Sequence, residues 1–491
     1  MIASAAPFTA QKAWGRFGLG ILAGASLALA QAPFNFPWIM PVLVPLVMLA
    51  LDRAHSPRAA AWLGWSTGLG HFAFALSWIV EPFLVDIARH GWMAPFALIL
   101  LAGGLALFWS AAFAIAARLA GPGWSRLLTA IALWAGFEWL RGHILTGFPW
   151  ALPAYGLEGT PLMQASAWIG PYGLSLILLF LLALPSRGLI PLSASLVGFS
   201  ALWIGGETRM RPAIDSGTTV RLIQPNAAQN QKWLPEMIPV FFERQVAATE
   251  AAGNPDVVIW SETAVPFLAG DRPDLVARMA KNTPIIYGLR RIDEAGNWYN
   301  SMAVAMEGQD LVYLDKVHLV PFGEYMPFAR LFAQLGVFGL AAEDVSGFSA
   351  GESLNAVQVE GMPVFLPLIC YEAVFPEEVR AARGEADWFV HITNDAWFGR
   401  WTGPYQHLAQ ARFRAVEHGV PVARAANTGI SAMIDPFGRV IASLPLGVDG
   451  FVDAALPIAL PQTMYGKFGD ALFAGLLGLV ATAGFLISRR A

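Results

Sequence analysis

The hydrophobic and polar positions form two different patterns along the chain. Residues 1–205 consist mostly of long apolar runs, and one further run lies near the end. Between about residues 211 and 457, short runs rich in β-branched and aromatic residues alternate with more polar stretches. Long apolar runs are typical of helices in lipid, whereas the alternating pattern is typical of a water-soluble α/β domain.

Eight apolar runs approach the length of about 20 residues that a helix needs to cross a bilayer. They lie at residues 17–32, 38–51, 59–80, 92–117, 127–140, 163–184, 189–205 and 471–488. The second and fifth runs are shorter and reach the length needed to cross a bilayer only if flanking residues are included. The pattern predicts a membrane domain at residues 1–210 with seven transmembrane helices. It also predicts an eighth helix and a cytoplasmic C-terminus within residues 458–491.

The amino-acid composition also indicates that one part of the chain lies in lipid and the other in water. The chain is 56% hydrophobic and only 13% charged, whereas soluble proteins carry about 25% charged residues. Residues 1–205 hold 14 of the 66 charged residues, and most of the others lie between residues 207 and 453. A net charge of -4 gives no reason to expect a nucleic-acid partner.

Basic residues in the connections between runs predict the orientation in the membrane. With the N-terminus inside, nine Lys and Arg residues fall on inside connections and two on short outside ones. This bias places residues 211–457 outside the cytoplasm. An alternative for the first run is a cleaved secretory signal peptide, because the run ends in the small-residue string ALAQA. Residues 211–457 lie outside in either case.

The outside segment alternates expected strands with expected helices. The strands are at residues 220–224, 257–260, 285–289, 301–306, 311–314, 365–369, 388–393 and 432–435, and the helices at 239–252, 274–281, 376–383 and 405–417. This alternation predicts a layered α/β domain.

Cys370 is the only cysteine of the chain and follows the apolar run 365–369. The polar residues after it predict the start of a helix, so the thiol is expected on a strand-to-helix turn. Open α/β sheets place their chemistry at such strand ends. The alternative is that Cys370 is a small buried hydrophobe.

Two other polar residues also follow short apolar runs, Glu262 in DVVIWSETAVP and Lys316 in LVYLDKVHLVP. A carboxylate that takes the thiol proton supplies a nucleophile, and a nearby cation stabilises the thiolate and then an oxyanion. Taken singly, Glu262 also fits a helix N-terminal carboxylate, and Lys316 a solvated lysine.

With the strings LICYE, PFGEYMP and NDAWFG, these three residues resemble the Glu-Lys-Cys triad of the nitrilase superfamily. Eight spans around such a domain resemble the apolipoprotein N-acyltransferase family over the full length. The resemblance implies an αββα sandwich in the periplasm, on the outer face of the bacterial inner membrane. It implies Glu262 as general base, Lys316 as oxyanion-stabilising lysine and Cys370 as nucleophile.

The resemblance also implies supporting or substrate-binding roles for four further residues. They are Glu324 of the PFGE string, Tyr371 and Glu372 after the nucleophile, and Trp233 of NQKWLPE on a mobile loop over the site. Alternatives are a turn carboxylate for Glu324, and packing or helix-start roles for Tyr371 and Glu372. His318, His391 and His407 lack a metal-ligand spacing and are interpreted as structural or solvated.

The activity implied by the resemblance is acyl transfer in two steps. Cys370 takes an acyl chain from a phospholipid, with phosphatidylethanolamine as the expected donor. It then passes the chain to the α-amino group of the diacylglyceryl-cysteine at the N-terminus of apolipoproteins. No metal and no cofactor are expected. Two alternatives stay open, a membrane-bound amidohydrolase acting on a C–N bond and a catalytically inactive binding module.

Overall fold

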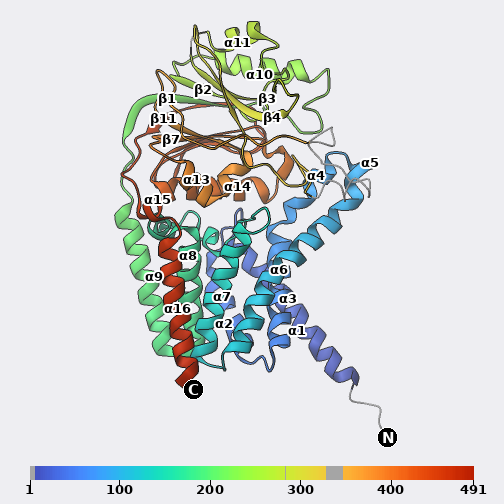
Figure 1. Ribbon diagram of the computed structural model, residues 1–491, viewed down its shortest axis with the longest axis vertical. Helices are drawn as coiled ribbons and strands as arrows, with labels where there is room; N and C mark the ends of the chain where they lie inside the picture. The colour runs from blue at the N-terminus through green and yellow to red at the C-terminus, as the bar shows by residue number, and fades with distance from the viewer. Residues whose placement is uncertain (1–5, 282, 328–346, 491) are drawn as a thin grey trace. The chain divides into compact units, whose positions relative to one another are not determined.

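The computed structural model of the chain describes residues 6–281, 283–327 and 347–490 (Figure 1). The chain divides into two compact units. One comprises Met1–Val80, Trp92–Met210 and Met464–Ala491, and the other comprises Glu81–Gly91 and Arg211–Thr463.

The first unit is helical. Its α-helices are α1 (Ala6–Leu27), α2 (Met40–Asp52), α3 (Pro57–Ala75), α6 (Ala94–Leu119), α7 (Trp124–His143), α8 (Ser166–Ala183), α9 (Leu189–Arg209), α15 (Met464–Phe468) and α16 (Ala471–Arg490). Each of the eight apolar runs falls on one of the long helices. Local chemistry sets the boundaries: α3 begins after Ser56, whose side chain accepts from the Ala59 amide, and has Pro57 in its first turn.

Glycines bring the helices of this unit into close contact. A Cβ on Gly24 of α1 would lie 1.8 Å from the Thr67 carbonyl oxygen of α3, and one on Gly64 of α3 would lie 2.4 Å from the Trp109 carbonyl oxygen of α6. Small residues at such crossings let backbones approach without a hydrophobic driving force, as in membrane helix pairs.

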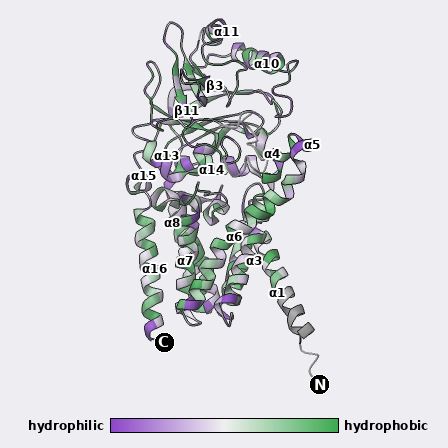
Figure 2. Cartoon of the chain, turned by 45° about the vertical axis from the view of Figure 1, so that its right-hand side comes forward, coloured by the Kyte–Doolittle hydropathy of each residue, from purple (hydrophilic) through white to green (hydrophobic). Residues whose placement is uncertain are grey.

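By length and composition, four helical stretches of the described chain suffice to cross a membrane: Ile87–Leu119, Pro161–Arg187, Leu189–Arg209 and Ala471–Arg490. Figure 2 shows hydrophobic residues along most of α16 and polar residues at its C-terminal end. The α2 helix has 13 residues and contains Pro45, and α7 carries Glu138 and Arg141. The number of crossings therefore stays a prediction.

The second unit contains two mixed sheets. The first has the strand order β11-β1-β2-β3-β4-β5, with β1 (Asp215–Gln224), β2 (Val257–Ile259), β3 (Ile285–Ile292), β4 (Trp298–Ala305), β5 (Val312–Asp315) and β11 (Gly450–Pro457). The second has the order β10-β9-β8-β7-β6, with β6 (Phe365–Ile369), β7 (Trp388–Thr393), β8 (Val422–Ala426), β9 (Ser431–Ile434) and β10 (Val440–Leu444).

Three apolar cores define four layers in this unit. One core lies between the sheets and combines side chains such as Ile259 and Met302 with Ile369 and Val390. A second packs helices α10 (Ile238–Glu250) and α11 (Pro273–Met279) on the first sheet. The third packs α13 (Pro376–Ala382) and α14 (Gly403–His418) on the second sheet. The short helices α4 (Glu81–Leu84) and α5 (Ile87–His90) also belong to this unit. The expected αββα sandwich and a separate unit of apolar helices are thus confirmed.

All eight expected strands and four expected helices of this unit are present within a few residues of their predicted bounds. The sequence pattern missed β8, β10 and β11. The β8 segment, VARAA, contains three alanines and an arginine, which are not strand-forming residues. It is a strand because β7 and β9 pair with it on either side and bury it completely.

Candidate active site

Cys370 lies at the carboxyl end of β6, as expected from the sequence. All five residues of β6 are buried, and Cys370 begins the 3-10 helix η8 (Cys370–Val374). Its φ of 53° is in the left-handed region, which is unfavourable for a residue with a Cβ. Such a turn directs the thiol away from the strand, and the neighbouring residues must hold it there.

Glu262 follows β2 and enters the same site. Its Oε1 accepts a 2.6 Å hydrogen bond from Asn300 Nδ2, and its Oε2 accepts a 2.8 Å bond from the Asn394 main-chain amide. Gly288 of β3 makes room for this segment, because a Cβ there would lie 2.6 Å from the Glu262 Cα. The site therefore needs a glycine at this position of the neighbouring strand.

Lys316 follows β5 and is 1% exposed. Its Nζ lies 2.8 Å from Glu324 Oε2 and 3.7 Å from Glu262 Oε1. Burial alone would lower the pKa of Lys316, but the carboxylates of Glu324 and Glu262 outweigh it and hold that pKa above its usual value. The lysine is therefore a permanent cation between two carboxylates, which excludes the solvated-lysine alternative.

Asn300 of β4 connects the two carboxylates and is not among the site residues expected from the sequence. Its Nδ2 donates to Glu262 Oε1 and, at 2.9 Å, to Glu324 Oε1. Glu324 also accepts a 2.8 Å bond from the Val320 amide. Asparagine is depleted in strands, so a buried Asn within the run WYNSMAVA was a signal that could have found it.

The thiol of Cys370 is only 6% exposed and faces these charges. Burial and the Glu262 carboxylate raise its pKa, while Lys316 and a hydrogen bond with Thr393 lower it; the net shift is upward. The resting sulfur is therefore a neutral thiol, so its proton has to leave as the sulfur attacks. Of the carboxylates that act on this sulfur, Glu262 has the larger effect and Asp395 the smaller.

Glu372 joins the Lys316 segment to the Cys370 segment. Its carboxylate accepts 2.7 Å hydrogen bonds from the main-chain amides of Val317 and Ile369. Burial raises the pKa of Glu372 to about 7, against the lowering effect of these bonds. Tyr371 packs its ring 4.9 Å from that of Phe375. The contacts of Glu372 indicate that it holds the two main-chain segments together. Those of Tyr371 indicate a packing role.

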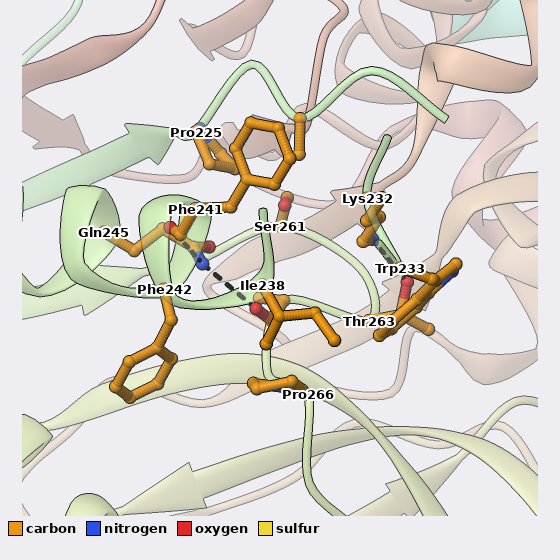
Figure 3. A pocket seen from close by; sticks show the side chains of 12 residues that line it. Pro225, Lys232, Trp233, Ile238, Phe241, Phe242, Gln245, Ser261, Thr263 and Pro266 are labelled. Atoms are coloured by element: carbon orange, nitrogen blue, oxygen red, sulfur yellow. Dashed lines mark hydrogen bonds between the residues drawn. The ribbon is translucent and has the colours of Figure 1, made fainter. Parts of the chain in front are cut away.

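Trp233 lines a small open pocket together with Phe241 and Thr263 and is 37% exposed (Figure 3). The neighbouring Lys232, also missed in the sequence, donates to the Glu262 carbonyl at 3.2 Å and to Thr263 Oγ1 at 2.7 Å. Burial lowers the pKa of Lys232 to about 7. The Lys232–Trp233 segment is thus bonded directly to the main chain of Glu262.

The structure brings Glu262, Lys316, Glu324, Cys370 and Glu372 into one buried cluster and places Trp233 beside the segment that carries Glu262. Within residues 6–281, 283–327 and 347–490, no group of three or more His, Cys, Asp or Glu residues is arranged to hold a metal ion. The arrangement of thiol, carboxylate and ammonium is suited to transfer of an acyl group through sulfur.

Comparison with known proteins covers both units. Residues 23–184 match the model of the apolipoprotein N-acyltransferase N-terminal domain, and residues 194–464 match that of the carbon-nitrogen hydrolases. An apolipoprotein N-acyltransferase of Bradyrhizobium diazoefficiens is 38% identical, with 95% of this chain and 94% of the relative aligned. One of Caulobacter vibrioides is 36% identical over 98% and 95%. The crystal structure of an amidase from Nesterenkonia sp. aligns with 54% of this chain and 99% of its own, at 18% identity and a TM-score of 0.36.

Proposed function

Because the chain belongs to the apolipoprotein N-acyltransferase family, we propose that it acylates the N-terminal cysteine of lipoproteins by a ping-pong mechanism. The acyl chain comes from a membrane phospholipid, with phosphatidylethanolamine as the expected donor. It is carried as a thioester on Cys370 and ends as an amide on the α-amino group of a diacylglyceryl-cysteine.

In the first step the thiol proton of Cys370 passes to Glu262 while the sulfur attacks the ester carbonyl of the phospholipid. The carbonyl oxygen becomes an oxyanion, which Lys316 stabilises. When the tetrahedral intermediate collapses, the C–O bond breaks and the leaving lysophospholipid oxygen takes the proton back from Glu262. The products are an S-acyl enzyme and a lysophospholipid.

In the second step the free α-amino group attacks the thioester. Glu262 accepts a proton from the attacking amine, the C–S bond breaks, and the sulfur leaves as a thiol after taking up that proton. Glu324 and Asn300 hold Lys316 and Glu262 in place throughout, and Glu372 fixes the two main-chain segments. Trp233 covers the acyl-enzyme and limits the access of water, which would hydrolyse the thioester.

The observation that carries this proposal is the position of Lys316. The Lys316 ammonium is buried, lies 3.7 Å from Glu262 and has its pKa held high by two carboxylates. A cation in this position is not a surface lysine, and it can stabilise an oxyanion that forms in the site. The Glu324 carboxylate, 2.8 Å from Nζ, pairs with this ammonium, so the cation is not left unpaired in a buried environment.

We further propose that the first, helical unit spans the bacterial inner membrane and that the αββα unit is periplasmic. The eight apolar helices and the nine-to-two distribution of basic residues support this placement. A membrane location suits the chemistry, because two lipid substrates confined to one leaflet have a raised effective concentration at a surface site.

A reconstituted transfer assay tests the proposed function. The purified full-length protein is mixed with phosphatidylethanolamine carrying one defined acyl chain and with a diacylglyceryl-cysteine peptide, and the peptide is weighed by mass spectrometry. The expected product is heavier by that acyl chain, on its α-amino group, and its mass follows the donor when the chain is changed. Release of free fatty acid or cleavage of a simple amide, without peptide acylation, would instead favour the amidohydrolase alternative.

A further inference from the structure

Two buried histidines, which the proposed mechanism does not use, both reach the main-chain carbonyl of Cys370. His391 Nε2 lies 3.1 Å and His407 Nε2 lies 3.2 Å from that oxygen. Because a carbonyl oxygen can only accept, each imidazole donates through its Nε2 hydrogen. Both side chains are fully buried, so of the two expected roles, structural or solvated, His391 and His407 have the structural one. The carbonyl of the nucleophile is thus held by two donors at once.

Asp395 contacts the side chains that surround these two histidines. Its Oδ1 accepts a 2.9 Å hydrogen bond from Thr393 Oγ1 and lies 3.0 Å from His407 Nδ1, and its Oδ2 accepts a 2.5 Å bond from Arg424. Burial alone would raise the pKa of Asp395, but Arg424 and His407 lower it to about 2. Arg424 also donates to His391 at 2.9 Å. Burial and Arg424 lower the pKa of both histidines, so each imidazole is neutral and its Nδ1 can only accept. Arg424 lies 2.9 Å from Nδ1 of His391 and 3.3 Å from Nδ1 of His407, and its guanidinium, held by Asp395, orients both rings.

Thr393 connects the same carboxylate to the sulfur. Strands β6 and β7 are parallel with Ile369 opposite Ile392, so the next residues, Cys370 and Thr393, face each other. The Thr393 side chain hydrogen-bonds with the Cys370 sulfur. While the sulfur is a thiol, S–H donates to Oγ1 and the hydroxyl donates to Asp395. Once the thiol proton has passed to Glu262, the hydroxyl is the group that can turn and donate to the thiolate.

Asp395 therefore reaches Cys370 by two routes, through Thr393 to the sulfur and through Arg424 and His407 to the carbonyl. We propose that Thr393, Asp395 and His407 are positioning residues, which hold the strained turn at Cys370 and aim its sulfur at the site of Glu262 and Lys316. This inference rests on the proposed role of Cys370 as nucleophile. A left-handed φ at a residue with a Cβ persists only where its surroundings fix it, and this network supplies that constraint.

The matched variants Thr393→Val and Thr393→Ser test the role of the hydroxyl. Val keeps the shape and removes the hydroxyl, whereas Ser keeps it. The charged groups around the sulfur are Glu262, Lys316 and Asp395, and all three remain in both variants. We expect Thr393→Val to lower the rate constant of Cys370 acylation about 10- to 100-fold, as for loss of a hydrogen bond to a charged group. The KM for phospholipid should stay unchanged, and iodoacetamide labelling of Cys370 should move to higher pH.

Thr393→Ser should retain most of the rate and the wild-type labelling profile. Thr249→Val removes a hydroxyl that bonds Trp260 on the far side of the first sheet, and it serves as a control that should change neither readout. For the carbonyl route, His407→Gln can still donate and should keep more activity than His407→Leu. This second pair keeps the test valid if Thr393→Val does not fold.

Three results would overturn the inference. Thr393→Val could show the wild-type rate and labelling, or Thr393→Val and Thr393→Ser could lose the same activity. The third is equal activity of the two His407 variants. Failure of the proposed function is a separate outcome, recognised by acyl transfer in Cys370→Ala. If Cys370→Ala is inactive while Thr393→Val behaves as wild type, only the positioning network is wrong.

Discussion

The side-chain amide of Asn300 donates a 2.6 Å hydrogen bond to the carboxylate of Glu262. The same nitrogen donates to Glu324, so one residue of β4 sets the spacing of the two carboxylates on either side of Lys316. In the proposed mechanism Glu262 accepts the thiol proton, and this transfer requires its carboxylate to keep one orientation.

Replacing Asn300 by leucine should therefore slow acylation of Cys370 strongly while leaving the fold intact. Leucine has a similar size but no donor, so Glu262 and Glu324 each lose one hydrogen bond. We expect a decrease of roughly 100-fold, the low end of what a positioned general base contributes. The measurement is the single-turnover rate of thioester formation with phospholipid. Asn355→Leu, at an exposed position, is the control and should react at the wild-type rate.

Lys316→Met and Glu262→Gln should have opposite effects on the thiol. Lys316 lowers the pKa of Cys370 and Glu262 raises it, so removing the cation destabilises the thiolate while removing the anion relieves repulsion. Labelling of Cys370 by iodoacetamide should titrate at higher pH in Lys316→Met and not in Glu262→Gln. Acylation should fall by about 100- to 1,000-fold in Lys316→Met, as for loss of one oxyanion donor. An unchanged rate and an unchanged labelling profile in Lys316→Met would exclude Lys316 from the site.

Much of the catalytic unit could be predicted from its pattern, because strands such as β6 and β7 are short apolar runs bounded by polar residues. The positions of Glu262, Lys316 and Cys370 after strands were visible for the same reason. Asn300 was missed although asparagine is unusual in a strand. Thr393, Asp395 and Arg424 were not recognised, because their importance comes from contacts between strands that are distant in sequence. Burial of Arg424 in β8 depends on Asp395 and His391, and no local pattern contains that information.

Stability should depend on pH through Glu372. Burial raises its pKa from 4.5 to about 7, so the folded protein binds this proton more tightly than the unfolded chain does. The stabilising contribution is complete below about pH 4.5 and is lost as the pH rises to about 7, an effect on the order of 3 kcal/mol. Glu372→Gln should be less stable than the wild type at pH 5, since only one of its two side-chain polar atoms can accept, and the difference should narrow by pH 8.

Thermal unfolding of the purified protein in detergent, followed by tryptophan fluorescence at pH 5 to 8, measures this difference. Glu352→Gln, at an exposed carboxylate, should follow the wild type at every pH. A constant difference between wild type and Glu372→Gln across the range would contradict the assignment of this titration to Glu372.

The orientation of the chain can be tested with reporter fusions. Alkaline phosphatase is active only outside the cytoplasm, and β-galactosidase only inside. A phosphatase fused after Gly270, in the loop between β2 and α11, should be active, and the galactosidase fused there should not. The reverse pattern would place the αββα unit in the cytoplasm and remove its access to periplasmic lipoproteins.

The mass of the intact protein after incubation with phospholipid alone tests the central claim most directly. The wild-type protein should gain the mass of one acyl chain, and this gain should change when a donor with 16-carbon chains replaces one with 18-carbon chains. Neutral hydroxylamine should remove the added chain, as expected for a thioester. Cys370→Ala should fold and gain nothing, and Cys370→Ser should gain little because its hydroxyl is far less ionised than a thiol. An acyl gain of the same size in Cys370→Ala, or no gain in a wild-type protein that still acylates the lipopeptide, would contradict a thioester on Cys370.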